Sequence, residues 1–91
     1  MEYKLLINGE LVDGAGTMPV LNPATEEILA ECPTASEDQL NEAVTAAQSA
    51  FEKWKETSLD ERRAKLGEIA DIIDANSDEL ARSLTQEQGK P

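Results

Sequence analysis

The residues that could do chemistry in this chain are a single thiol, Cys32, and a large set of carboxylates. The sequence contains no histidine, the commonest general base and metal ligand of proteins. Cys32 lies in an apolar run without a nearby lysine, arginine or histidine to activate it, which indicates a packed, unreactive cysteine. The carboxylates could pair as acid and base, but most are expected on polar helix faces, where they are solvated. These residues therefore predict no catalytic centre within the chain.

Two glycine-containing stretches match nucleotide-binding loops only in part. Gly14-Ala15-Gly16 lacks the remaining glycine and the strand–helix context of a dinucleotide loop, so we interpret it as a turn. Gly89-Lys90 lacks the upstream glycine of a phosphate-binding loop and is more typical of a helix end. Neither stretch predicts a cofactor site.

The charge balance limits the partners of the chain. Acidic residues outnumber basic ones 19 to 8, which gives a net charge of -11 over 91 residues. Such a surface repels phosphate backbones and anionic lipid, so we expect neither a nucleic-acid nor a membrane partner. No apolar run is long enough to span a bilayer, and the start does not resemble a signal peptide. The single cysteine excludes a disulfide framework and is typical of a cytoplasmic protein.

The first 35 residues are expected to form two short β-hairpins in tandem. Residues 3–7 are β-prone and lead into Asn8-Gly9, the commonest two-residue hairpin turn, and residues 10–13 return. The second pair of strands is expected at residues 18–21 and 28–32, joined by a turn after Asn22-Pro23. Pro33 should end the last strand or lie on a sheet edge.

Residues 36–91 are predicted to form three amphipathic helices. Ser36 with Gln39, and Ser58 with Glu61, have the spacing of capping boxes. Each helix carries an apolar stripe. The stripes are Leu40, Ala43, Val44, Ala47, Phe51 and Trp54; Leu66, Ile69, Ala70 and Ile73; and Leu80, Ala81 and Leu84.

The boundaries of the third helix follow from its flanking residues. Asn76 is an acceptable C-terminal cap for the second helix, Ser77 is the expected N-cap of the third, and Gly89 should end it. Two hairpins followed by three helices define an α+β fold. A few short strands cannot cover all the stripes, so we expect exposed apolar surface and self-association. Phe51→Ala should cost about 3–5 kcal/mol if the ring is fully buried.

Several stretches occur in an order and at spacings that together are specific, although each is weak alone. They are residues 6–10 (LINGE), 22–30 (NPATEEILA), 43–47 (AVTAA) followed by Phe51 and Trp54, Arg62-Arg63, 78–81 (DELA) and 87–91 (EQGKP). This set resembles the N-terminal segment of the NAD(P)-dependent aldehyde dehydrogenases and covers essentially the whole chain. One departure is Glu26, where that family usually has glycine in the turn.

The resemblance implies an enzyme that oxidises an aldehyde to a carboxylic acid through a cysteine thioester, with NAD or NADP as hydride acceptor. The family's nucleophilic cysteine, general-base glutamate and oxyanion-hole asparagine lie beyond Pro91, and Cys32 does not match the nucleophile's motif. Residues 1–91 would then be the outer part of the cofactor-binding domain, catalytically inactive alone. The implied partners are the remainder of the enzyme chain, an aldehyde, and further copies of the intact enzyme in a homo-oligomer.

The resemblance also implies a site for K+ or Na+. The matching ligands are the backbone carbonyls of Val20 and Leu21 and the side-chain carboxylate of Glu87, because a hard cation prefers oxygen donors. The alternative for Glu87 is a solvated side chain beside ordinary strand carbonyls. A different alternative concerns the whole chain, which could be a free-standing acidic helical module that binds a protein partner through an apolar helix face.

Overall fold

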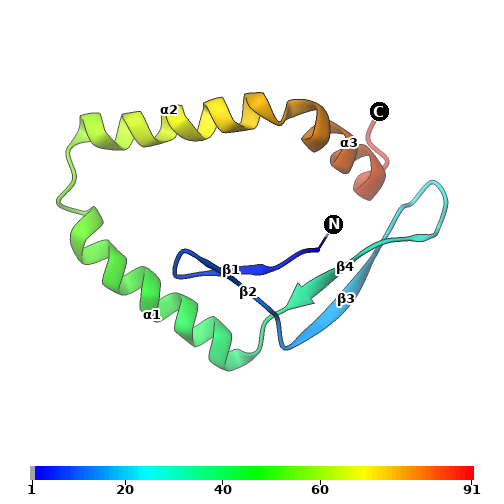
Figure 1. Cartoon of the computed structure of the whole chain (residues 1–91), viewed down its shortest axis with the longest axis horizontal. Coiled ribbons are helices and arrows are strands. Elements are labelled where there is room, and N and C mark those ends of the chain that lie inside the picture. Colours follow the sequence, from blue (N-terminus) through cyan, green and yellow to red (C-terminus); the bar gives the residue numbers. More distant parts are fainter. Residues whose placement is uncertain (1) are drawn as a thin grey trace.

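Two antiparallel hairpins precede three helices in the computed structural model, which describes residues 2–91 (Figure 1). The strands are β1 (Leu5–Ile7), β2 (Glu10–Val12), β3 (Gly16–Leu21) and β4 (Ile28–Thr34). The helices are α1 (Glu37–Trp54), α2 (Leu59–Ala75) and α3 (Ser77–Gln88). This order confirms the predicted α+β arrangement. No helix among residues 2–91 is long and apolar enough to cross a membrane.

The first hairpin turns at Asn8-Gly9, as predicted. Both residues have positive φ, 52° and 77°, which is the requirement of a type I′ turn. Leu5 pairs with Val12 and Ile7 with Glu10. The strands are shorter than the expected ranges 3–7 and 10–13, because the pairing stops at Leu5 and Val12.

In the second hairpin, β3 begins earlier than predicted and β4 ends later than predicted. Gly16 already pairs with Thr34, so the expected break at Gly14–Gly16 ends one residue earlier. Pro33 lies inside β4 opposite Thr17. In a two-stranded sheet every strand is an edge strand, so the missing N–H of proline is tolerated there. Of the two predicted positions for Pro33, the end of the strand or a sheet edge, the structure shows the edge. A register shift between Val20 and Leu21 interrupts the pairing near the turn.

Glu26 adopts a left-handed backbone in the turn between β3 and β4. Its φ is 61°, a conformation that costs a residue with a side chain about 1–2 kcal/mol. The turn holds it there: Glu26 N donates to Asn22 O at 2.7 Å, and Asn22 Oδ1 accepts from Ala24 N at 2.9 Å. Glu26 thus adopts a left-handed conformation that glycine, the usual residue of the family at this position, would adopt without strain.

The start of α1 confirms the predicted capping box. Ser36 Oγ accepts from Gln39 N at 3.1 Å, and Gln39 Oε1 accepts from Ser36 N at 3.0 Å. Gln39 Nε2 also donates to Asp13 O at 2.9 Å, which ties the helix to the loop before β3. At α2 only half of the predicted box forms, since Ser58 Oγ accepts from Glu61 N at 3.1 Å without a reciprocal bond from the Glu61 side chain.

The expected N-cap of α3 was wrong, whereas its end was predicted correctly. Ser77 is the first helical residue, and Asn76 precedes it without a side-chain cap bond. The Asn76 amide donates backwards to Ile72 O at 2.8 Å, so it serves the end of α2 and cannot cap α3. Gly89 ends α3 with φ 71°, and its N–H donates to Thr85 O at 2.8 Å.

The chain forms an open arrangement with almost no buried core. Among the described residues Ile7 is the one buried hydrophobic side chain, 7% exposed. The accessible surface is 7577 Å², whereas a compact monomer of 9.9 kDa would expose about 5,200 Å². The radius of gyration is 16.8 Å, against about 12 Å for a compact chain of this length. Figure 1 shows the helices following one another around the hairpins without forming a bundle.

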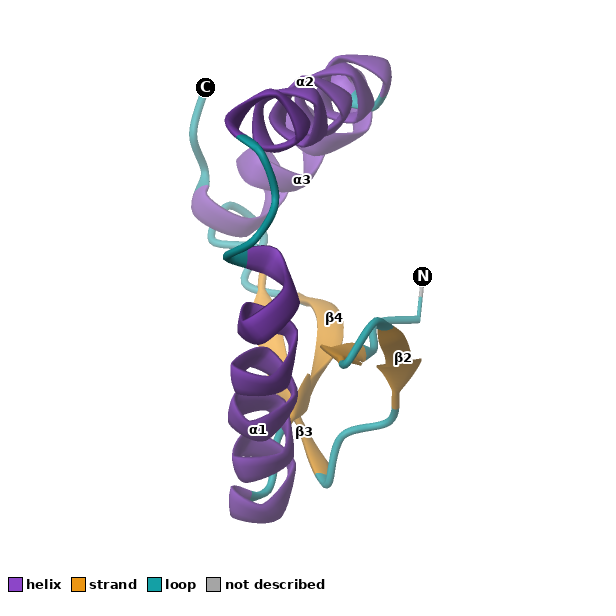
Figure 2. Cartoon of the chain, turned by 90° about the vertical axis from the view of Figure 1, so that its left-hand side faces the viewer, coloured by secondary structure: helices purple, strands orange, loops and turns teal. Residues whose placement is uncertain are grey.

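The four alanines of α1, two of them outside the predicted stripe, lie next to the first hairpin, whereas the large side chains of the stripe stay exposed. Ala43 and Ala46 are half-buried against the first hairpin, which they reach together with Ala47 and Ala50. The larger side chains Leu40, Val44, Phe51 and Trp54 remain exposed. Phe51 is 55% exposed, so the condition for the 3–5 kcal/mol effect of Phe51→Ala is not met. Figure 2 shows α1 running beside the strands.

Candidate functional site

A hollow of about 370 Å³ separates α3 from the second hairpin and contains several of the residues predicted to matter. Val20 and Cys32 reach it from the hairpin, and Glu87 reaches it from α3. Its complete lining is Tyr3, Val20, Leu29, Ala30, Cys32, Glu79, Leu80, Ser83, Gln86 and Glu87. Two of the three proposed cation ligands are thus brought to one place, and Leu21 is outside the lining.

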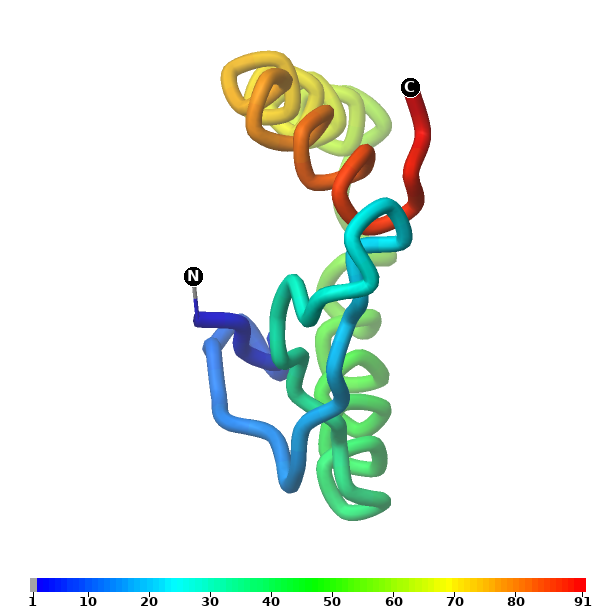
Figure 3. The backbone as a smooth tube through the Cα atoms, turned by 90° about the vertical axis from the view of Figure 1, so that its right-hand side faces the viewer, coloured from blue at the N-terminus to red at the C-terminus, as the bar shows by residue number. Residues whose placement is uncertain are grey.

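The turn of the second hairpin contacts the end of α3 near the hollow. Pro23 lies against the end of α3, because a Cβ built on Gly89 would be 3.3 Å from Pro23 Cγ. Figures 1 and 3 agree that the turn after β3 lies beside the C-terminal end of the chain. Pro23 directly follows Asn22, whose side-chain oxygen accepts a hydrogen bond from Ala24 N within the turn. This bond helps to fix the turn that leads out of β3.

The donors around the hollow suit a hard cation in type but are few. The register shift after Val20 interrupts regular pairing where the Val20 and Leu21 carbonyls lie, and Glu87 supplies a carboxylate. Oxygen donors of these two kinds are the ones that hard cations prefer. Within residues 2–91 no group of three or more His, Cys, Asp or Glu side chains is placed to hold a metal ion. Any complete coordination shell would need further ligands.

The surroundings of Cys32 fit an unreactive thiol. The side chain is half-buried, and the lining of the hollow around it includes no lysine or arginine. Cationic neighbours are what activate cysteine nucleophiles, and they are absent from this lining. The position of Cys32 gives no support to a catalytic role.

The sequence analysis did not predict Glu79 as a lining residue of the hollow, although a helical spacing of polar residues indicates it. Glu79, Ser83 and Gln86 follow one another at helical spacings of four and three, so they share one face of α3. Glu87 continues the same face. The pattern was overlooked because these side chains are polar, and the apolar residues Leu80 and Leu84 were used to define the stripe.

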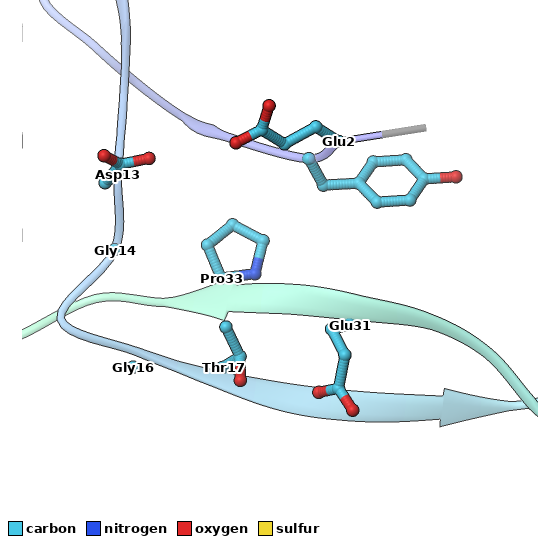
Figure 4. Close-up of a pocket in the computed structure, with 8 residues that line it drawn as sticks. Glu2, Asp13, Gly14, Gly16, Thr17, Glu31 and Pro33 are labelled. Carbon is cyan, nitrogen blue, oxygen red and sulfur yellow. The ribbon is translucent and has the colours of Figure 1, made fainter.

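A second recess, of about 490 Å³, lies between the start of the chain and the second hairpin (Figure 4). Glu2 and Asp13 border it on one side, and Glu31 lies on β4 (Figure 4). Lys4 forms ion pairs with Asp13 and with Glu2, the latter at 3.1 Å. These pairs raise the pKa of Lys4, the Asp13 hydrogen bond contributing most. The recess is therefore a partly neutralised acidic surface and offers no acid–base pair.

Arg62 has a structural task that sequence reasoning did not assign. Its Nη2 donates to Lys55 O at 3.0 Å, and its Nε donates to Thr57 Oγ1 at 3.2 Å. Thr57 Oγ1 in turn donates to Trp54 O at 2.6 Å. Backbone N–H groups already bond the carbonyls of Phe51, Lys53 and Trp54. Arg62 adds a donor for Lys55 O and thereby fixes the corner between α1 and α2.

Comparisons with known proteins point to one family. The family model described as "Aldehyde dehydrogenase family" matches residues 11–91. A probable aldehyde dehydrogenase from Pseudomonas sp is 43% identical over 89 residues, which cover 98% of this chain and 18% of that protein. A 3,6-anhydro-alpha-L-galactose dehydrogenase from Streptomyces coelicolor is 44% identical over 82 residues, covering 90% of this chain and 17% of that protein.

A more distant relative and a solved structure agree with this result. A probable mitochondrial methylmalonate-semialdehyde/malonate-semialdehyde dehydrogenase [acylating] from Dictyostelium discoideum is 36% identical over 89 residues, covering 96% of this chain and 17% of that protein. The crystal structure of an aldehyde dehydrogenase from Bartonella henselae matches all of this chain with a TM-score of 0.92 and 33% identity. This chain covers 20% of that structure. This chain therefore spans 17–18% of the length of these relatives and 20% of the solved structure.

Proposed function

Because this chain belongs to the aldehyde dehydrogenase family, we propose that it serves as part of an enzyme that oxidises an aldehyde to a carboxylic acid with NAD(P)+. The observation that carries the proposal is the match of the entire chain to a solved aldehyde dehydrogenase, with a TM-score of 0.92 at 33% identity. The activity belongs to the longer polypeptide of which such a stretch forms about a fifth.

The role of residues 1–91 in that enzyme is to act as a scaffold at the outer part of the cofactor-binding domain. The described residues contribute two antiparallel hairpins and three helices, and neither sheet has the parallel strand–loop–helix unit that binds a dinucleotide. They therefore do not fit NAD(P)+, which would bind elsewhere in the enzyme and accept hydride there. The cysteine that forms the thioester likewise belongs to another part of the enzyme, since Cys32 lacks activating neighbours.

The substrate is proposed only as a class. The printed names of the relatives include a sugar-derived aldehyde and a semialdehyde, and each name applies to its own protein. No described pocket of this chain has the features that would select among aldehydes. The proposal includes a homo-oligomer, which rests on the family alone, and a cytoplasmic location, since the single thiol suits a reducing compartment.

A K+ or Na+ site with Val20, Leu21 and Glu87 among its ligands is also proposed. The common hollow of Val20 and Glu87 supports it. The test compares thermal unfolding of the longer enzyme in KCl and in a bulky-cation salt at equal ionic strength. We expect K+ to stabilise the wild type more than Glu87→Gln, and equal stabilisation of both would remove Glu87 from the ligands.

The function is tested by comparing two proteins. The purified 91-residue chain should show no aldehyde-dependent reduction of NAD+ or NADP+, whereas the polypeptide encoded by the complete reading frame should show it. Turnover by the 91-residue chain that disappears in Cys32→Ser would overturn the scaffold role. A complete reading frame without aldehyde oxidation would overturn the enzyme and favour an acidic protein-binding module, for which the exposed helix faces are the supporting observation.

A further inference from the structure

The turn of the first hairpin places an asparagine directly before a glycine in an accessible position. Asn8 and Gly9 are the two central residues of the turn, and the ladder closes around them with Ile7 opposite Glu10. Both turn residues are exposed. A Cβ built on Gly9 would meet no atom within 4 Å, so other side chains do not crowd the Gly9 backbone. The Gly9 nitrogen is therefore open to reaction with the side chain that precedes it.

We propose that Asn8 is a site of spontaneous deamidation, and that its modification loosens the first hairpin from α1. The Gly9 nitrogen attacks Asn8 Cγ, and the new C–N bond closes a cyclic imide. The Cγ–Nδ2 bond breaks, and Nδ2 leaves as ammonia with the proton of the Gly9 N–H. Water then opens either C–N bond of the imide, which leaves aspartate or isoaspartate at position 8. No oxidant or reductant takes part.

The chain has four asparagines, and the other three are each held back from this reaction. Asn22 precedes Pro23, whose nitrogen carries no hydrogen to lose. Asn41 lies inside α1, where the N–H of the following residue is bonded within the helix. The side-chain amide of Asn76 donates to Ile72 O at 2.8 Å and is fixed by that bond. The three provide comparisons within the same molecule.

The turn must open before the imide can form. Asn8 has a left-handed backbone, φ 52°, and the imide requires a different rotation about the Cα–C bond of asparagine. The ladder that holds the turn has three residue pairs, from Leu5–Val12 to Ile7–Glu10. A two-stranded hairpin is of marginal stability by itself, and short ladders open locally at low cost. The rate of deamidation therefore depends on how often the first hairpin opens.

The product alters the contact between the first hairpin and α1. Asn8 lines a hollow together with Asp38 and Glu42 of α1, and Figure 1 shows the tip of the hairpin directed toward this helix. Deamidation places a third carboxylate beside these two, and like charges at short range repel one another. Isoaspartate also lengthens the backbone of a turn that accommodates only two residues. Ile7, the one buried hydrophobic side chain among residues 2–91, directly precedes the turn.

The first experiment follows the reaction in the polypeptide encoded by the complete reading frame, incubated in warm, near-neutral buffer. Mass spectrometry of a digest detects each amide that has become an acid as a gain of about 1 Da. The gain should accumulate faster at Asn8 than at Asn22, Asn41 or Asn76 of the same sample. Isoaspartyl methyltransferase, which methylates isoaspartate, should label the peptide that contains position 8. Equal gains at all four positions, or none at Asn8, would overturn the inference.

Gly9→Ala separates the chemistry from the opening of the turn. A residue with a side chain is strained at φ 77°, so this variant opens the turn more often. The added methyl group also hinders attack by the adjacent nitrogen, so deamidation of Asn8 should slow several-fold despite the looser turn. Gly67→Ala, at an uncrowded position inside α2, is the control and should leave the rate unchanged. A rate in Gly9→Ala that equals or exceeds that of the wild type would contradict attack by this nitrogen.

The structural consequence is measured by hydrogen exchange of the β1 and β2 amides. Asn8→Asp should retain the turn, since Asp-Gly is also a favoured pair for it, and should lower protection only at low salt, where charge repulsion is unscreened. The isoaspartate form, purified after incubation, should lose protection at any salt concentration. Unchanged protection in that form would refute the loosening of the hairpin. These outcomes are independent of aldehyde oxidation, because the inference does not rest on the proposed function.

Discussion

Gly89 ends α3 directly against Pro23 of the second hairpin: a Cβ built on Gly89 would lie 3.3 Å from Pro23 Cγ. The two residues are far apart in the sequence, and their contact joins the third helix to the β3–β4 turn (Figure 3). A left-handed backbone, φ 71°, lets α3 stop at this point. Glycine is needed here both for its conformation and for its lack of a side chain.

Gly89→Ala should lower the free energy of unfolding by at least about 1 kcal/mol, because it adds left-handed strain and a tight contact with Pro23. Gly67→Ala is the matched control, since Gly67 lies inside α2 with no atom within 4 Å of an added Cβ. That control should raise the free energy of unfolding by about 0.8–1 kcal/mol. Urea unfolding at low protein concentration compares them, and effects of the same sign would contradict the role of Gly89.

Glu26→Gly should stabilise the chain by about 1 kcal/mol, since it removes the cost of a side chain at φ 61°. Glu27→Gly tests the same loss of charge at a neighbour without positive φ, and it should not stabilise. Thermal unfolding of both variants decides the matter. If Glu26→Gly proved neutral or destabilising, the Glu26 side chain would have to make a favourable interaction that offsets its backbone strain.

Arg62→Gln should lower the free energy of unfolding by about 1–2 kcal/mol, because the α1–α2 corner loses charged hydrogen bonds to Lys55 O and Thr57 Oγ1. Arg63→Gln is the control, as Arg63 is exposed and has no described hydrogen bond. Equal effects of the two substitutions would show that net charge, and not the corner, accounts for the change.

Lys4 provides a pH-dependent contribution to stability. Asp13 and then Glu2 raise its pKa in the folded state above the ordinary 10.5. A raised pKa means that the ion pairs stabilise the fold fully below pH 10.5, and that this stabilisation is lost as the pH rises through the folded pKa. Unfolding of wild type and Lys4→Gln from pH 8 to 12 should therefore differ at low pH and converge at high pH. A constant difference would contradict the pairing.

Phe51→Ala should cost only about 1–2 kcal/mol in the isolated chain, because the ring is half-exposed. Part of that cost reflects Lys55, whose Nζ lies 5.6 Å from the ring centroid. Sedimentation of the same variant should show weaker self-association, and Gln48→Ala should not. A loss of 3 kcal/mol or more would mean that the ring is buried in solution.

Local features of this molecule and the exposure of its apolar helix stripes could be predicted from the sequence, whereas the contacts between distant segments could not. The Asn8-Gly9 turn and the Ser36 capping box depend on residues no more than three positions apart, so the sequence determines them directly. Which face of α1 lies next to β1 depends on how closely two segments distant in sequence can pack. The alanine face lies there because its small side chains permit close packing. Asn76 caps the C-terminal end of α2, as predicted, through the hydrogen bond from its side-chain amide to Ile72 O. Ser77 is the first residue of α3 and does not act as its N-cap, as had been expected.

The residues of the candidate site could likewise be predicted only in part. Family resemblance placed Val20 and Glu87 together, and the structure lines one hollow with both. Leu21 does not line the hollow, and its proposed ligand is the backbone carbonyl, which this lining does not test. The register shift after Val20 is a feature that leaves no clear mark in the sequence. Glu79 was missed because the helical pattern was followed through apolar residues alone.

The amide of Gln39 bonds at both of its ends, to Ser36 N through Oε1 and to Asp13 O through Nε2. One side chain therefore completes the first turn of α1 and attaches it to the loop that directly follows β2. Helix nucleation, which is unfavourable by itself, is thereby coupled to a contact next to the first hairpin. The amide hydrogens at the start of α1 and those of the β1–β2 ladder should accordingly exchange with solvent as one cooperative unit.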